Sequence, residues 1–360
     1  MICNDNPGRL IACAVLAAGI TFGCKTQSAE GKVTTIESLV AREKRETSFD
    51  NGQKREQYLV RRDKGGSYVK DGSYTSFHLG GQKAEEGSFK DGNADGRWQR
   101  WDENGKLSVE LNYRVGKREG AYTAFNDGRP RESGNFTGDQ LSGPYKYFAL
   151  NDSVVAGNTQ AGVPTGTWTI TDAGGKLRAR AEFKEGKLDR DVLSFAADGS
   201  TRPPAVGHSC SEFDGFTLGK TTWDEVVFGS LARAQAFPGD GGIDKVSSGR
   251  VLLLGNDLMD RPGFKEIRLV FDQNDVLSAM YTTARKQLEG GSAYASNFKA
   301  LHAEFVKKYR IVSANMPFVG DTHAEYKGAG CNISMKAPHM SFDMEVALES
   351  DDFVKQRANK

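Results

Sequence analysis

The sequence has almost no excess charge of either sign. Its 48 lysines and arginines are balanced by 47 aspartates and glutamates, which leaves a formal net charge of +1. Nucleic-acid binding depends on a basic surface that neutralises phosphates. The charge balance therefore excludes the usual electrostatic basis for a nucleic-acid partner, and we expect none.

Cysteine and histidine are scarce, with five of each among 360 residues. The histidines form no i,i+4 pair, and the sequence contains no Cys-x-x-Cys, His-Glu-x-x-His or Gly-x-Ser-x-Gly motif. Those spacings are typical of zinc sites and of activated serine nucleophiles. We therefore expect no catalytic residues, no metal and no cofactor, and we expect that the protein is not an enzyme.

Long apolar runs are also missing, apart from one near the N-terminus. Leu10 to Gly23 is an apolar stretch of 14 residues. It is shorter than the roughly 20 residues that cross a bilayer, but its length is typical of a signal-peptide core. Residues 1–23 are therefore expected to be a signal peptide rather than part of the fold.

The end of this stretch resembles the signal of bacterial lipoproteins. Gly23 is followed by Cys24 and then at once by polar sequence. The resemblance implies that Cys24 carries the lipid and that the membrane is contacted through this N-terminal lipid. Because Lys25, not an acidic residue, follows, it also implies a cell-envelope protein at the outer membrane, facing the periplasm. A cleaved signal without lipidation is the alternative.

Two further cysteines would remain in the mature chain. Cys210 and Cys331 are expected to form a disulfide, because an exported protein folds in an oxidising compartment. The alternative is a reactive thiol at Cys210, since His208 lies two residues before it.

Residues 24–65 are expected to form a tether and a degenerate first repeat. This segment mixes lysine and arginine with glutamate and aspartate. Mixed charge of this kind favours a solvated segment over a charged binding patch.

A unit with the pattern glycine-x-aromatic-x-x-aromatic recurs through residues 66–200. Its steps are 23 or 24 residues, and each unit also contains glycine-rich turns such as Asn104-Gly105. Such turns favour β-hairpins, and a regular period predicts stacked repeats that share one core. The second strand of the fourth unit, around Gly157, lacks an aromatic and is expected to be a weak point.

The aromatic residues of these units have two possible roles. Packing within the repeat core is the favoured interpretation, for example for Trp98 and Trp101. The alternative is a ligand-binding face, whose candidate residues are Tyr74, Trp98, Trp101, Tyr122, Tyr145 and Trp168.

The repeat pattern resembles MORN-type repeats, and in particular the MORN-variant repeats of the YwqK family, whose members are labelled antitoxins. The resemblance rests on the Gly-x-aromatic spacing and on turns such as Asn104-Gly105-Lys106. It implies a twisted β-hairpin array with a role in protein or membrane-lipid contact. It implies no catalytic residues.

Residues 206–360 are expected to form a separate α+β domain, because two prolines at 203–204 break the repeat period. Thr222 and Glu225 have the spacing of a helix capping box. Residues 267–271 and 276–281 are expected to form a hairpin. An amphipathic helix is expected to bury Phe298, Leu301, Phe305 and Tyr309.

Two further strands are expected at the end of this domain. One would place Cys331, Ile333 and Met335 on its buried face. The other would bury alternate residues, namely Phe342, Met344, Val346 and Leu348. The helices are expected to cover one face of the resulting sheet.

The predicted fold class is thus a mainly β repeat array, a MORN-like β-hairpin ladder, followed by a C-terminal α+β domain. The function that these features favour is a non-enzymatic cell-envelope lipoprotein that binds or scaffolds proteins through its repeat array. The alternative is a periplasmic immunity protein, an antitoxin that neutralises an exported toxin. The partner would then be an envelope protein or a toxin.

Overall fold

The computed structural model describes residues 41–149, 152–196, 198–203, 213–234, 236–258, 263–286, 296–317 and 320–360. It also describes four two-residue strands near the N-terminus, which are β1 (Ile2–Cys3), β2 (Ile11–Ala12), β3 (Thr26–Gln27) and β4 (Val33–Thr34). β1 pairs with β2, and β3 pairs with β4.

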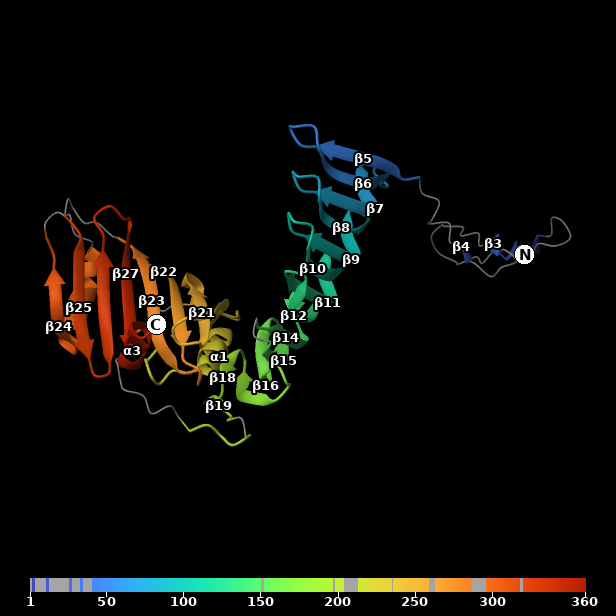
Figure 1. Ribbon diagram of the computed structural model, residues 1–360. Helices are drawn as coiled ribbons and strands as arrows, with labels where there is room; N and C mark the ends of the chain where they lie inside the picture. The colour runs from blue at the N-terminus through green and yellow to red at the C-terminus, as the bar shows by residue number, and fades with distance from the viewer. Residues whose placement is uncertain are drawn as a thin grey trace. The chain divides into compact units, whose positions relative to one another are not determined.

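The predicted fold class is confirmed. Fifteen strands form an antiparallel hairpin ladder, and a second sheet of eight strands follows it (Figure 1). The described residues also contain three short α-helices. The chain divides into two compact units, residues 1–129 and 130–360. This division falls inside the repeat array, where the repeat period continues without a break.

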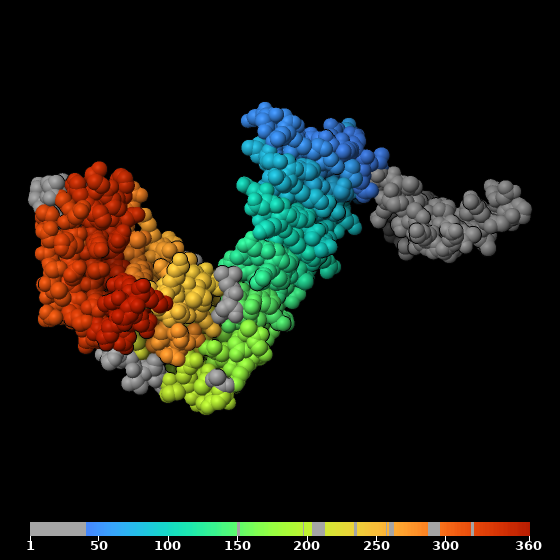
Figure 2. All heavy atoms as spheres, in the orientation of Figure 1, coloured from blue at the N-terminus to red at the C-terminus, as the bar shows by residue number. Residues whose placement is uncertain are grey.

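Unit 1 contains seven strands of the ladder, each hydrogen-bonded to the next in sequence order. They are β5 (Glu43–Ser48), β6 (Lys54–Arg62), β7 (Tyr68–Phe77), β8 (Lys83–Lys90), β9 (Asn93–Trp101), β10 (Leu107–Arg114) and β11 (Lys117–Asn126). Taken alone, this stack of hairpins forms an elongated body, coloured from blue to green in Figure 2.

The turn between β9 and β10 shows how the sequence closes a hairpin. The Asp102 carboxylate accepts hydrogen bonds from the backbone N–H groups of Asn104 and Lys106, both at 2.9 Å. Gly105 then takes a φ of 77°, which a glycine adopts without strain. The turn therefore depends on the aspartate at its start as well as on the glycine.

The core of unit 1 is built from rings that lie on small residues. In the register of β7 and β8, Tyr74 lies opposite Gly87. The indole of Trp98, from β9, covers the same glycine so closely that an added Cβ would lie 2.2 Å from it. Glycine at this position therefore allows consecutive repeats to stack through their rings.

Unit 2 contains the remaining strands of the ladder. They are β12 (Arg129–Thr137), β13 (Gln140–Leu141), β14 (Gly143–Phe148), β15 (Val154–Gln160), β16 (Val163–Thr171), β17 (Leu177–Lys184), β18 (Lys187–Leu188) and β19 (Leu193–Ser194). Gly157 in β15 lies under Trp168, again 2.2 Å from a built Cβ. Gly157 was expected to mark a weak strand, but it packs beneath a fully buried tryptophan.

The eight-stranded sheet has the order β20-β21-β22-β23-β27-β26-β25-β24 and is antiparallel throughout. Its strands are β20 (Gly239–Ile243), β21 (Arg250–Gly255), β22 (Phe264–Phe271), β23 (Leu277–Arg285), β24 (Arg310–Asn315), β25 (Thr322–Gly328), β26 (Cys331–Ala337) and β27 (Asp343–Ser350). The predicted hairpin is the pair β22–β23.

The helices are α1 (Trp223–Ala234), α2 (Ser296–Lys308) and α3 (Asp351–Ala358), with a short 3-10 helix η2 (Asn256–Leu258). The predicted capping box is confirmed at α1. The backbone N–H of Thr222 donates to Glu225 Oε2 at 2.8 Å, and the N–H of Glu225 donates to Thr222 Oγ1 at 3.3 Å.

The expectation that the helices cover one face of the sheet is wrong. Phe305 of α2 packs on Tyr326. Tyr326 belongs to a line of directly paired residues that crosses the sheet to Leu269 in β22, so the two residues share one face. Phe353 of α3 packs on Val270, which is the next residue along β22. Successive residues of a strand point to opposite faces, so α2 and α3 lie on opposite sides.

Burial in the two final strands follows the sequence with one exception. Cys331, Ile333 and Met335 of β26 are buried, as are Met344, Val346 and Leu348 of β27. Phe342 was predicted to join the buried set, but it precedes β27 and is 78% exposed. The alternation of buried and exposed residues holds within β27 and does not extend to Phe342, which precedes its first paired residue.

Among the described helices, none has the length and hydropathy needed to cross a membrane.

Candidate binding surfaces

The six aromatics predicted as a binding face do not share one exposed surface. Four of them, Tyr74, Trp98, Tyr145 and Trp168, are buried, and Trp168 is fully so. Trp101 and Tyr122 are half-buried. The buried four contribute to the core of the ladder, so any ligand of these six would contact chiefly Trp101 and Tyr122.

The rings of unit 1 form a continuous row, which we call the ring stripe and define as Tyr58, Tyr74, Phe89, Trp98, Tyr113 and Tyr122. Neighbouring rings meet edge to face: the centroids of Phe89 and Trp98 are 5.1 Å apart, and those of Trp98 and Tyr113 are 5.7 Å apart. Such pairs add stability beyond the area they bury. These contacts therefore hold the rings of the stripe against one another.

Charged residues are built into one end of the ring stripe. The Lys70 ammonium lies over Tyr58 and Tyr74, at 4.6 and 4.4 Å from the ring centroids. The Tyr74 hydroxyl donates to Glu56 at 2.8 Å. Burial, followed by this hydrogen bond, raises the pKa of Tyr74 to about 12. The hydroxyl therefore stays protonated and holds the ring in place.

Four rings of the stripe are only partly covered by the chain. Tyr58, Phe89, Tyr113 and Tyr122 pack against the buried rings but keep part of their surface exposed. Contiguous exposed apolar surface with a polar border is typical of protein-contact sites. The ring stripe thus gives unit 1 a surface suited to an apolar side chain.

The equivalent rings of unit 2 are covered by the chain itself. Phe237, which follows α1, stacks on Tyr147 with a centroid distance of 4.3 Å and an interplanar angle of 10°. It also lies 6.0 Å from Tyr145 and 6.4 Å from Trp168. Further along, Phe228 of α1 meets Phe183 at 6.2 Å. The repeat surface of unit 2 therefore binds a helix and a following phenylalanine.

An ionic cluster fastens the last repeats to the α+β part of unit 2. Asp275, in the β22–β23 turn, pairs with Arg178 of β17 and with Arg250 of β21, the latter at 3.2 Å. Ser194 of β19 donates to Asp224 Oδ2 at 2.9 Å. These contacts join strands of the ladder to α1 and to the second sheet.

Asp224 is the least satisfied group in this cluster. Its other oxygen, Oδ1, is buried and has no hydrogen-bond partner among the described residues. Burial, with a contribution from the nearby Asp275, raises the pKa of Asp224 to about 6. An ionised Asp224 is costly in this position, because a buried charge needs a partner.

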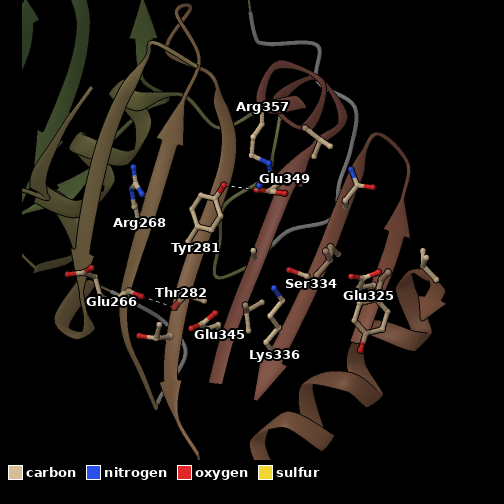
Figure 3. A pocket seen from close by; sticks show the side chains of 18 residues that line it. Glu266, Arg268, Tyr281, Thr282, Glu325, Ser334, Lys336, Glu345, Glu349 and Arg357 are labelled. Carbon is tan, nitrogen blue, oxygen red and sulfur yellow. Dashed lines mark hydrogen bonds and ion pairs between the residues drawn. The ribbon is translucent and has the colours of Figure 1, made fainter. Parts of the chain in front are cut away.

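The face of the eight-stranded sheet that carries α3 has a polar hollow of about 690 Å³. Figure 3 shows Tyr281 pointing toward Glu349, to which it donates at 2.6 Å, with Arg357 of α3 beside them. Burial and this hydrogen bond raise the pKa of Tyr281. Four carboxylates and three cations line the hollow: Glu266, Glu325, Glu345, Glu349, Arg268, Lys336 and Arg357.

No motif in the sequence indicates this hollow. Its polar residues alternate with the buried ones in the final strand, for example Glu345 between Met344 and Val346. That alternation indicated a solvated face. The face becomes a hollow through the sheet order and through α3, which a single sequence does not reveal.

Most of the remaining predicted site residues lie outside the described residues. Cys24 and Cys210 lie outside the described residues, so lipidation and the disulfide stay predictions. Cys331 is fully buried at the start of β26. Within the described ranges, no group of three or more histidine, cysteine, aspartate or glutamate side chains has a geometry suited to a metal ion.

Comparison with known proteins identifies one repeat. Residues 94–114 match the family described as the MORN repeat variant. The match spans most of β9, the Asp102 turn and β10, which together form one hairpin of the ladder. It confirms the MORN-repeat part of the resemblance. No curated protein matches the chain.

Proposed function

We propose that this protein is a non-enzymatic, protein-binding module of the cell envelope, and that the ring stripe of unit 1 is its contact surface. MORN repeats commonly serve as protein-binding or scaffolding modules, which agrees with the match at residues 94–114. The proposal includes a lipid on Cys24 and an outer-membrane location facing the periplasm. These rest on the sequence of residues 1–25 alone.

The observation that carries the proposal is the covered surface of unit 2. There the repeats hold Phe237 between the rings of Tyr145, Tyr147 and Trp168. The same repeat pattern builds the ring stripe in unit 1, where Tyr113 and Tyr122 are half-buried. A surface that binds an apolar side chain within its own chain has the chemistry to bind one from another protein.

A photo-crosslinking residue placed at position 122 tests the proposal in cells. We expect it to capture a defined envelope protein, because Tyr122 is a partly exposed ring of the stripe. The matched control is position 68: Tyr68 is also in unit 1 and 44% exposed, but it lies outside the ring stripe. Equal capture at both positions, or none at 122, would contradict the proposal.

A substitution measures the contribution of the same ring. Tyr122→Ser should reduce recovery of the captured protein at least about tenfold, in the range expected for a central aromatic contact. Tyr68→Ser should leave recovery unchanged. Because Tyr122 is only half-buried, the variant is expected to keep its fold, which circular dichroism checks.

The alternative within this proposal is an exported toxin as the partner. The label of the YwqK family, which the repeats resemble, supports it. It requires a toxin gene beside this one and growth arrest when this gene alone is deleted. Normal growth of the deletion strain would leave an envelope protein as the partner.

A further inference from the structure

Strand β24 leaves one edge of the eight-stranded sheet uncovered. It is the terminal strand of the order, and among the described strands only β25 pairs with it. Five of its six residues are exposed, including Ile311 at 45% and Val312 at 55%. An edge strand offers unpaired backbone groups, so the partner that fits it is another strand.

Other edges in the described chain carry features that discourage pairing. β5, at the end of the ladder, has the sequence EKRETS and exposes charges of both signs. β20, at the other edge of the eight-stranded sheet, has the sequence GDGGI and an irregular register. β24 has the sequence RIVSAN, with no proline and a single charge. Natural edges are usually protected by charge, proline or irregularity, and β24 has only a register shift between Ile311 and Ser313.

We propose that β24 pairs antiparallel with β24 of a second copy of this chain. A twofold axis at Val312 places Val312 opposite Val312 of the second copy and Ile311 opposite Ser313. The same register places Arg310 opposite Ala314. The one charge of each strand therefore meets a neutral side chain, and no like charges face each other.

The pairing joins two eight-stranded sheets across a short contact. A six-residue strand buries less than the roughly 1,200 Å² of a stable interface. The register shift at Val312 also shortens the regular part of β24 that can form backbone hydrogen bonds. We therefore expect a weak, concentration-dependent dimer, which a membrane anchor would favour by confining both copies to one surface.

Energy transfer between donor-labelled and acceptor-labelled full chains measures this association. The expected result is a dimer signal that rises with concentration and that Val312→Lys weakens at least about tenfold, because two lysines then meet at the centre of the pairing. The matched control is Ile243→Lys, an isoleucine that is 61% exposed on the opposite edge strand. It should leave the association unchanged.

A charge-reversal mixture separates pairing from an indirect effect. Val312→Glu should weaken self-association as Val312→Lys does, whereas a mixture of the two variants should restore the signal. An unrestored mixture would overturn the proposal. A wild-type chain that stays monomeric would also overturn it. This holds even if substitutions in β24 abolish binding to a different protein.

Discussion

Gly87 and Gly157 let the ring of the next repeat lie directly on their strand. A Cβ built on Gly87 would lie 2.2 Å from the indole of Trp98. A Cβ built on Gly157 would lie 2.2 Å from the indole of Trp168. Real side chains do not approach so closely, so any larger residue would displace a tryptophan that is nearly or fully buried.

Gly157→Ala should therefore destabilise the protein by about 1–3 kcal/mol, the usual cost of overpacking a core. Urea unfolding followed by tryptophan fluorescence measures it. Gly229→Ala is the matched control in the same unit, because its Cβ would meet nothing within 4 Å. Gly229 lies inside α1, so the control should gain about 0.5–1 kcal/mol. Equal effects of the two changes would refute the packing argument.

At the scale of elements, α1 and the residue that follows it are held against the last repeats. Phe237 stacks on Tyr147, and Asp275 joins Arg178 of β17 to the second sheet. Asp224 lies in the first turn of α1, where its carboxylate is favoured by the helix dipole but penalised by burial. The attachment of these elements is therefore expected to depend on pH.

The sign follows from the direction of the shift. The pKa of Asp224 rises from 3.8 to about 6 in the folded state, so the folded state holds this proton more tightly than the unfolded one. Its contribution to stability is complete below 3.8 and is lost as the pH rises through 6. Between pH 5 and pH 8 the loss is about 1.4 kcal/mol, the equivalent of one pKa unit.

Urea unfolding of the wild type and of Asp224→Asn at pH 5 and pH 8 isolates this contribution, because all other groups titrate in both proteins. We expect the stability of the wild type, relative to the variant, to fall by about 1.4 kcal/mol from pH 5 to pH 8. A difference that stays constant with pH would show that Asp224 is not the titrating group.

The sequence predicted the elements better than their contacts. The 23- to 24-residue period gave the hairpins, and Thr222 with Glu225 gave the start of α1. Phe237 carried no signal, because it follows the helix without periodicity and meets rings about 70 to 90 residues earlier in the chain. Asp224 lies between the capping residues Thr222 and Glu225, and its buried position depends on contacts such as that with Ser194, which is far away in sequence.

For the whole molecule, the proposed lipid anchor would make the position of the chain in the cell depend on one residue, Cys24. Cys24→Ser removes the sulfur that would carry the lipid, since a thioether cannot form on a hydroxyl. We expect the variant to lose incorporated radiolabelled palmitate and to appear in the soluble periplasmic fraction. Palmitate retained by the variant would remove Cys24 from the proposal. A wild type that is unlabelled and soluble would instead favour a plain cleaved signal.

The placement of Trp98 on Gly87, and of Trp168 on Gly157, makes the ladder modular. Every hairpin brings one half of each contact, so the array tolerates the gain or loss of an entire 23- to 24-residue unit more readily than that of a single residue. Duplication within the gene would lengthen the ladder without a new core. The number of copies thus sets the length of the ladder, which evolution can change in steps of one whole unit.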